Sequence, residues 1–173
     1  MIVVSDTGPL ISMMKAGQFN LLHLLYQEII IPDAVFAELT VNENYPEEAE
    51  TIRSSTFVKT VSVTDRRAVE ILQRVSGLDL GESEAIVCAD DRKADVLLME
   101  EEAGRRAARA MGLHVRGSIG ILLLGFDSGF ITSQDVIKAA DRMMASNRRI
   151  SKELYDYMKN YVNRPGEHTI ANR

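Results

Sequence analysis

The sequence has little of what marks a secreted, zinc-binding or membrane protein. Its single cysteine, Cys88, cannot form an internal disulfide, which fits a reducing compartment. The three histidines lie far apart, at positions 23, 114 and 168, and with one cysteine they give no zinc-binding pattern. The longest apolar run, around residues 121–124, is too short to span a membrane, and no signal peptide is visible at the N-terminus. These absences predict a soluble, cytoplasmic protein.

Several binding and catalytic signatures are also missing. No Gly-x-Gly-x-x-Gly or Walker-type loop follows a predicted strand, so a nucleotide cradle is not indicated, and no Gly-x-Ser-x-Gly elbow occurs. The net charge of −5 disfavours the binding of polyanions through the field of the whole protein. A nucleic-acid substrate would therefore need a local basic patch or bound metal ions.

What is present is an alternation of buried-strand and helical patterns over 173 residues, a length that fits one domain. The first strand contains three consecutive β-branched residues, Ile2, Val3 and Val4, as expected for a strand buried on both faces. Strands and helices that alternate in this way predict an α/β fold, with a parallel sheet covered by helices on both faces.

The boundaries follow from the apolar spacing and the residues that flank each segment. Strands are predicted over residues 2–4, 28–31, 57–63, 94–99 and 113–116. Helices are predicted over residues 9–15, 18–26, 32–39, 47–53, 65–75, 80–92, 100–111, 118–128, 132–146 and 151–163. Thr64 is predicted to cap the helix 65–75. Residues 42–46 form a predicted turn, and the last ten residues a frayed end.

Acidic residues follow two of the predicted strands. Asp6 comes directly after the first strand, and Glu100 directly after the strand 94–99. Ligands of open parallel sheets collect at the carboxyl ends of the strands, so both carboxylates occupy positions suited to a site. Asp6 has a simpler alternative as a turn or N-cap residue. Glu101 and Glu102 have basic residues four positions further on, whereas Glu100 has no evident partner.

Two helices carry acids where acids are costly. Glu38 is the only charge within residues 34–39 and projects from an apolar face, unless it lies at a helix edge and reaches water. Glu84 lies inside the nearly apolar helix 80–92 and has no capping role to explain it. Glu82 does have one, because Asp79-x-x-Glu82 has the form of a capping box.

Carboxylates that converge at one sheet edge repel each other, so we expect a cation between them. Oxygen ligands without histidine or cysteine suit Mg²⁺ or Mn²⁺. Such an ion can orient a water molecule, lower its pKa and stabilise charge on a phosphodiester. The sequence therefore predicts metal-assisted phosphodiester hydrolysis.

The segments that carry these acids resemble a PIN domain, and in particular a subgroup of prokaryotic PIN proteins related to VapC toxins. The likeness covers roughly residues 1–145 and extends in part to the segment 149–155. The motifs that carry it are Ser5-Asp6-Thr7-Gly8-Pro9-Leu10, Ile31-Pro32-Asp33-Ala34-Val35-Phe36-Ala37-Glu38-Leu39, Leu80-Gly81-Glu82-Ser83-Glu84-Ala85-Ile86, Ala94-Asp95-Val96-Leu97-Leu98-Met99-Glu100, Gly104-Arg105-Arg106 and Gly117-Ser118-Ile119-Gly120-Ile121-Leu122.

The resemblance implies a Rossmann-like three-layer α/β/α sandwich, with a PIN-like nuclease domain over residues 1–145 and a helical extension over 146–173. It also implies a Mg²⁺- or Mn²⁺-dependent endoribonuclease, often the toxin of a toxin–antitoxin pair, that acts on RNA as a homodimer and has an antitoxin as its protein partner. The fourth acidic position of the family usually carries Asp, whereas here Glu100 or Glu101 stands there. The catalytic residues implied are Asp6, Glu38, Glu84 and Glu100, with Asp6, Glu84 and Glu100 as metal ligands and Thr7, Glu82 and Glu101 as further candidates.

Contacts to the substrate and to a second subunit are predicted from other features. Arg105 and Arg109, on the helix after the acids, could hold phosphates, although pairing with Glu101 explains Arg105 equally well. Met13, Met14, Met143, Met144 and the apolar run 121–124 offer more apolar surface than one small core needs, which favours an oligomer.

Two other functions compete with the nuclease. A phosphatase could use Asp6 as nucleophile, but such enzymes usually have a second Asp two residues on, where this chain has Gly8. A PIN scaffold without catalytic activity could instead bind RNA or a protein partner.

Overall fold

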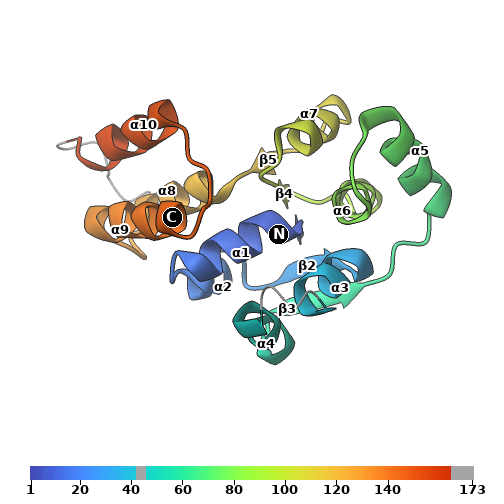
Figure 1. Ribbon diagram of the computed structural model, residues 1–173, viewed down its shortest axis with the longest axis horizontal. Coiled ribbons are helices and arrows are strands. Elements are labelled where there is room, and N and C mark those ends of the chain that lie inside the picture. Colours follow the sequence, from blue (N-terminus) through green and yellow to red (C-terminus); the bar gives the residue numbers. More distant parts are fainter. Residues whose placement is uncertain (42–45, 165–173) are drawn as a thin grey trace.

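The computed structural model describes residues 1–41 and 46–164, and these form a five-stranded, all-parallel sheet with ten helices around it (Figure 1). The strand order is β3-β2-β1-β4-β5, so the first strand of the chain lies at the centre. The strands are β1 Val3–Ser5, β2 Ile29–Pro32, β3 Val58–Val61, β4 Val96–Leu98 and β5 Val115–Arg116. The predicted turn 42–46 and frayed C-terminus lie, apart from residues 46 and 164, outside the described residues.

The helices begin and end close to the predicted positions. They are α1 Thr7–Lys15, α2 Phe19–Tyr26, α3 Asp33–Val41, α4 Pro46–Ser54, α5 Arg66–Ser76, α6 Leu80–Asp91, α7 Glu102–Ala110, α8 Ser118–Asp127, α9 Ser133–Ala145 and α10 Lys152–Val162. Within the described ranges, none of these helices has the length and apolar character that a membrane span requires.

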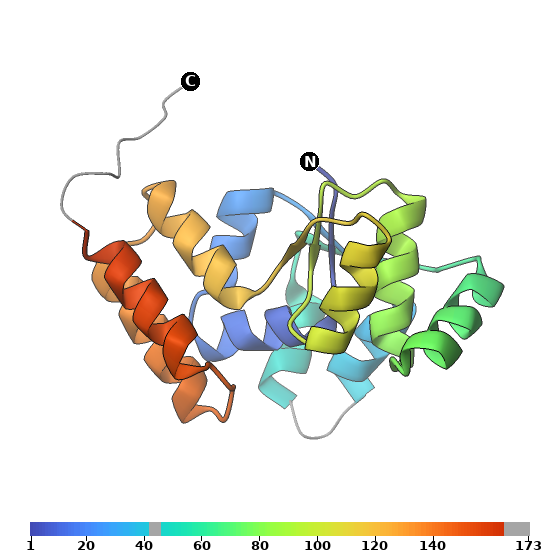
Figure 2. The same ribbon diagram turned by 90° about the horizontal axis from the view of Figure 1, so that it is seen from above.

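The sheet separates two hydrophobic cores, which confirms the predicted α/β/α sandwich. Neighbouring residues of a strand point to opposite faces, so Val3 of β1 enters one core and Val4 the other. The first core contains side chains of α1, α2, α8 and α9, and the second contains side chains of α5, α6 and α7. Figure 2 shows these two groups of helices on opposite sides of the strands. Because both faces are covered, the inner strands β1, β2 and β4 are mostly apolar, whereas the edge strand β3 contains the exposed residues Lys59 and Thr60.

The C-terminal helix α10 packs against α8 and α9. Its residues Met158 and Val162 belong to the same buried cluster as α1 and β1. The domain boundary expected near residue 145 stays a prediction, and the structure shows α10 joined to the main core by apolar contacts.

The apolar residues that favoured an oligomer are largely used inside the chain. Met13 and Met143 are buried, and so are Ile121 and Leu122 of α8. Only Met144 of this group is exposed. The argument from surplus apolar surface was therefore wrong, because α8 and α9 bury most of these side chains in the core of the chain, and the homodimer rests on the resemblance alone.

Side-chain caps stabilise the first turns of α5 and α6. The predicted capping box of α6 is present, with Asp79 accepting from the backbone N–H of Glu82 and the Glu82 carboxylate accepting from that of Asp79. At α5 the cap is Asp65, not the predicted Thr64, since the Asp65 carboxylate accepts from the N–H of Ala68.

Candidate active site

The carboxyl ends of β1 and β4 lie side by side at the middle of the sheet. The two strands pair in register from Val3 with Val96 to Ser5 with Leu98. The N–H of Asp6 donates to the carbonyl of Leu98 at 3.0 Å, so the chain leaves both strands at the same level. Asp6 and Glu100 therefore follow neighbouring strand ends, as the topology of a parallel sheet requires.

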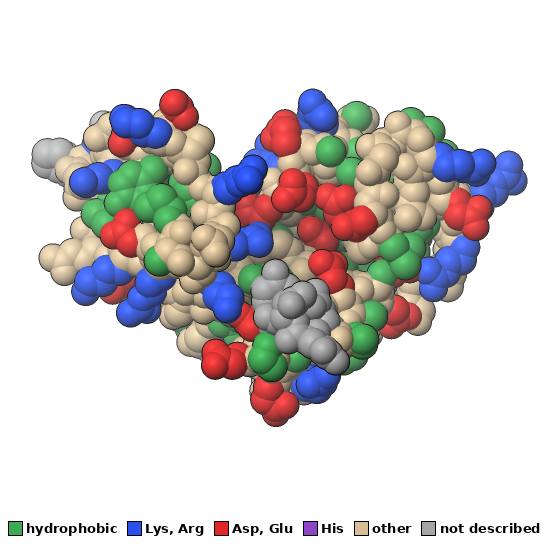
Figure 3. All heavy atoms as spheres, in the orientation of Figure 1, with side chains coloured by type: hydrophobic (Ala, Val, Ile, Leu, Met, Phe, Trp, Pro, Cys, Tyr) green, Lys and Arg blue, Asp and Glu red, His purple; other side chains and the backbone are tan. Residues whose placement is uncertain are grey.

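A cavity of about 240 Å³ opens at this edge, and six carboxylates line it. They come from four separate parts of the chain: the end of β1, α3, the start of α6 and the segment before α7. Figure 3, in the orientation of Figure 1, shows acidic side chains gathered in the middle of this face with basic side chains beside them. The lining residues are Asp6, Glu38, Asp79, Glu82, Glu100 and Glu101, together with Thr7, Gly8, Ile11 and Arg148.

Asp6 is the most deeply placed of these acids, with 5% of its surface exposed. Burial raises the pKa of its carboxyl from 3.8 to about 7; the backbone N–H of Thr7 works against this rise, and the nearby carboxylates of Glu82, Asp79 and Glu38 add to it. Although Asp6 precedes α1, its side chain makes no capping hydrogen bond, so the N-cap alternative does not explain it. No described Lys or Arg pairs with it.

Glu38 faces the cavity from α3, but it is exposed rather than buried. The expectation of an apolar surrounding was wrong, because Val35 and Leu39 form the buried side of this helix. The hydroxyl of Thr7 donates to Oε2 of Glu38 at 2.7 Å and so orients the carboxylate. Thr7, a further candidate from the resemblance, therefore contacts an acid of the site.

Asp79 and Glu82 both line the cavity while they cap α6. Burial raises the pKa of Glu82, the backbone N–H of Asp79 counteracts this, and the carboxylates of Asp79, Glu101 and Glu38 reinforce it. A Cβ at Gly81 would lie 3.3 Å from Oε2 of Glu38, so the first turn of α6 approaches α3 closely. Sequence reasoning missed Asp79 because it treated capping and a role in a site as alternatives.

Glu100 has a partner that the sequence did not reveal. Its Oε1 accepts from the backbone N–H of Ser118 at 2.8 Å and from the hydroxyl of the same residue. A carboxylate at the start of α8 is stabilised by the free N–H groups and the dipole of that helix. Glu101, next to it, is exposed and also lines the cavity, so both candidates for the fourth acid are at the site.

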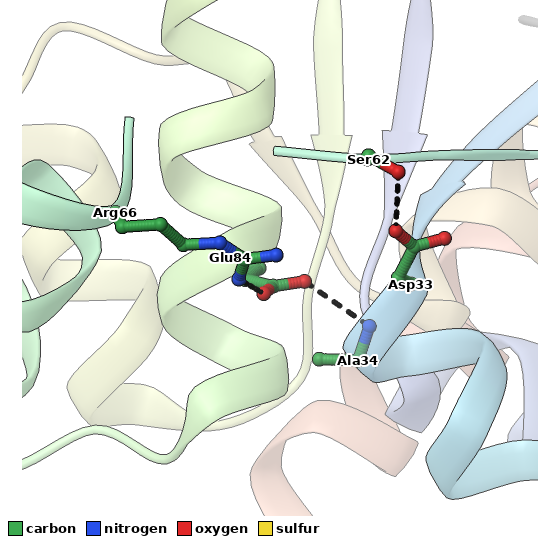
Figure 4. A network of polar contacts seen from close by, with 5 residues as sticks. All are labelled: Asp33, Ala34, Ser62, Arg66 and Glu84. Carbon is green, nitrogen blue, oxygen red and sulfur yellow. Dashed lines mark hydrogen bonds and ion pairs between the residues drawn. The ribbon is translucent and has the colours of Figure 1, made fainter. Parts of the chain in front are cut away.

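Glu84 points away from the cavity. Only 1% of its surface is exposed, and its two oxygens bond to Arg66 of α5 and, at 3.1 Å, to the backbone N–H of Ala34. Figure 4 shows this contact, with the Asp33–Ser62 hydrogen bond of 2.5 Å beside it. The structure thus brings Asp6, Glu38 and Glu100 together but leaves Glu84 outside, with Glu82 in the cavity instead.

The two arginines predicted to hold phosphates, Arg105 and Arg109, also lie in different surroundings. Arg105 donates to the carbonyl of Met99 at 2.9 Å and lines a second cavity next to Glu100. Arg109 is exposed on α7 and is not among the residues that line these cavities. Among the described residues, Glu101 forms no ion pair with Arg105, and Glu102 forms none with Arg106. Arg148, from far along the chain, lines the acidic cavity itself.

The chemical type of the candidate ligands fits a divalent metal ion. All the candidate ligands are carboxylate or hydroxyl oxygens, and a buried carboxylate with a raised pKa is the group that a cation would stabilise. In the part of the chain that the structure describes, no three acidic, histidine or cysteine side chains already stand in position to hold a metal ion.

The arrangement defines a class: an α/β/α sandwich with an acidic cavity at the carboxyl ends of its two central strands. The family is given by comparison with family models, in which DUF3368, a PIN domain, matches residues 2–164; the chain belongs to this PIN-domain family. PIN domains are in general nucleases that bind nucleic acid and typically use divalent metal ions. No curated protein and no solved structure matched the chain in the corresponding comparisons.

Proposed function

We propose that this protein is a Mg²⁺- or Mn²⁺-dependent endoribonuclease, and that Asp6 is the central ligand of its metal site. The observation that carries the proposal is the placement of Asp6, a buried carboxylate without a described cationic partner, in a cavity shared with five other carboxylates. An uncompensated buried charge is costly, so such a group calls for a cation.

The cavity suggests a role for each acid. Asp6, Glu82 and Glu100 would hold the metal ion, with Glu101 as an alternative to Glu100. When bound, the ion supplies charge stabilisation and a water molecule of lowered pKa. Thr7 holds Oε2 of Glu38, and the other oxygen of this carboxylate would accept a proton from the attacking water.

The test is cleavage of RNA by the purified chain with and without Mn²⁺ or Mg²⁺. We expect cleavage that EDTA abolishes, and a loss of roughly 100-fold or more in Asp6→Asn, the range seen when charge stabilisation is removed from an active site. Glu70→Gln, which neutralises an exposed acid on α5, serves as the matched control and should keep full activity. Full metal-dependent activity in Asp6→Asn would exclude this site.

A second candidate function is an inactive PIN scaffold that binds RNA or a protein partner. Two observations favour it: no ready-made metal site exists among the described side chains, and Glu100 is engaged with Ser118. Titration that detects no Mn²⁺ binding at millimolar concentration would support the scaffold over the enzyme. The toxin role, the antitoxin partner and the homodimer remain proposals that rest on the resemblance, and the cytoplasmic location remains one that rests on the composition.

A further inference from the structure

The connector between α9 and α10 brings a basic side chain to the acidic cavity. The connector, residues 146–151, turns at Asn147, which has a φ of 60°, in the left-handed region that Asn tolerates better than most residues. The next residue, Arg148, donates its backbone N–H to the carbonyl of Met143 at 3.0 Å. The turn therefore directs the Arg148 side chain toward α1.

That side chain is held in place by α1. Its Nε donates to Oγ of Ser12 at 2.9 Å and its Nη2 to the carbonyl of Gly8 at 3.2 Å. A Cβ on Gly8 would lie 3.5 Å from the same Nη2, so the guanidinium rests directly on the first turn of α1. Fixing a long arginine side chain loses rotamer entropy, which solvated surface arginines retain. The two hydrogen bonds therefore hold the Arg148 side chain in one position, unlike a solvated surface arginine.

The guanidinium is not used as a counter-ion for the acids around it. It lines the same cavity as six carboxylates, yet none of the described carboxylates forms an ion pair with it. Both acceptors that it does contact are neutral oxygens. Of the five N–H donors of a guanidinium, three remain after these two bonds. Their planar fork matches the oxygens of a phosphate.

A third cavity, of about 490 Å³, also has Arg148 in its lining. It shares Arg148, Glu100 and Glu101 with the acidic cavity and adds Arg149 from the connector. Its volume falls within the roughly 300–1,000 Å³ of small-molecule sites, which suits a ribonucleotide. Apolar side chains that can contact a base line part of it: Ile119, Met143, Ile150 and Leu154.

We propose that Arg148 binds a backbone phosphate of single-stranded RNA, and that the cavity beside it receives the adjoining nucleotide. The inference rests on the proposed ribonuclease function, whose scissile phosphate would lie at the acidic cavity next door. It also bears on the problem set by the net charge of −5, because Arg148 and Arg149 place two positive charges in the lining of this cavity, beside Glu100, Glu101 and Glu102. An acidic peptide is less suited, since its carboxylates offer no group for the acidic cavity to act on.

The experiment measures binding of fluorescein-labelled single-stranded RNA by anisotropy, in EDTA so that no cleavage occurs, over a series of salt concentrations. We expect Arg148→Gln to bind about tenfold more weakly, because a charge-assisted hydrogen bond is lost. The slope of log K against log salt should fall by about 0.7, the value for one contact to a single strand. Arg67→Gln, which removes an exposed charge from α5, should change neither quantity.

Two further variants separate phosphate binding from a purely structural role. Arg148→Lys keeps the charge but loses the fork, so we expect an intermediate affinity with the salt slope of the wild type. Ser12→Ala frees the guanidinium without removing it, and should weaken binding a fewfold, again with an unchanged slope. If Arg148→Gln lowers the melting temperature but leaves affinity and slope at the values of Arg67→Gln, the residue is only structural and the inference is wrong.

The outcome for this inference can be told apart from that for the enzyme. RNA binding that depends on Arg148, without any metal-dependent cleavage, would support the subsite and refute the nuclease. Metal-dependent cleavage together with RNA binding that does not depend on Arg148 would support the nuclease and refute the subsite. Equal, Arg148-dependent binding of polyglutamate would overturn the assignment to RNA and point to an acidic protein partner.

Discussion

The substitution Asp6→Asn should stabilise the metal-free protein at alkaline pH. The unfolded chain ionises Asp6 near pH 3.8, whereas the folded protein holds the pKa at about 7 because the carboxyl is buried among other acids. Below pH 3.8 both states carry the proton. Between these pH values the folded state binds more protons, so stability falls as pH rises through about 7, and above it the loss is complete.

The size of the effect follows from the two pKa values. A difference of about three units at about 1.4 kcal/mol each gives an upper bound of roughly 4 kcal/mol. Asparagine is nearly isosteric and uncharged, so Asp6→Asn should avoid this penalty at about pH 8 and gain little at about pH 3, where both states of the wild type are largely protonated. Bound metal should reduce this difference, since a cation that binds only the folded wild type stabilises it by about 1.4 kcal/mol at ten times its Kd and by about 4 kcal/mol at a thousand times its Kd.

The assay is urea unfolding followed by far-ultraviolet circular dichroism, because the chain contains no Trp. Each variant is measured in EDTA at both pH values, and again with Mn²⁺ at the alkaline pH. Glu70→Gln, at an exposed position of α5, controls for the loss of one negative charge. The reasoning fails if Asp6→Asn shifts the free energy of unfolding equally at both pH values, or if Mn²⁺ stabilises it as much as the wild type.

Two other substitutions test the division of the acids between structure and site. Glu84→Gln should lower the free energy of unfolding by roughly 1–3 kcal/mol, because the charge-assisted bonds to Arg66 and Ala34 are weakened, while Mn²⁺ affinity measured by calorimetry stays within about twofold. A large loss of affinity in a fully folded Glu84→Gln would return Glu84 to the metal site. Gly81→Ala should instead stabilise the fold but lower the activity. Alanine in place of glycine favours the helix by up to about 1 kcal/mol. Its Cβ would lie 3.3 Å from Oε2 of Glu38, so we expect cleavage activity to fall at least fewfold. Unchanged activity in Gly81→Ala would argue against a role for Glu38.

The sequence specified the succession of strands and helices well, because long apolar patterns and local caps decide it. The helix predicted from residue 100 instead begins at Glu102, since Glu101 keeps an extended N-cap conformation with φ −64° and ψ 131°. This delay is what frees Glu100 to reach Ser118 across the sheet edge. A contact between residues 18 positions apart leaves no periodic signal, so no local pattern could have given it.

The contact of Arg148 with α1 could not be predicted from the sequence either, and it joins residues even further apart. Its bond to Gly8 spans 140 positions, and it depends on how α9 and α10 pack against the body of the fold. In the sequence, Arg148 and Arg149 form an ordinary basic pair before a helix. The apolar residues of α8 and α9 led to the wrong prediction of surplus apolar surface. Side chains buried inside a chain and side chains buried in a subunit interface have the same composition.

Glu82 and Glu84 show why the third acid could not be chosen from the sequence. Two residues apart on a helix, their side chains differ by about 200° in direction, so only one of them can face the cavity. The pattern of α6 does not say which, since the helix is buried from Gly81 to Ala89 and has no polar face to set the phase. The structure adds a reason for both. Glu84 holds the first turn of α3 through Ala34, and α3 carries Glu38 to the cavity that Glu82 lines from α6. The acid that lies outside the site thus joins the two helices that bring these acids into it.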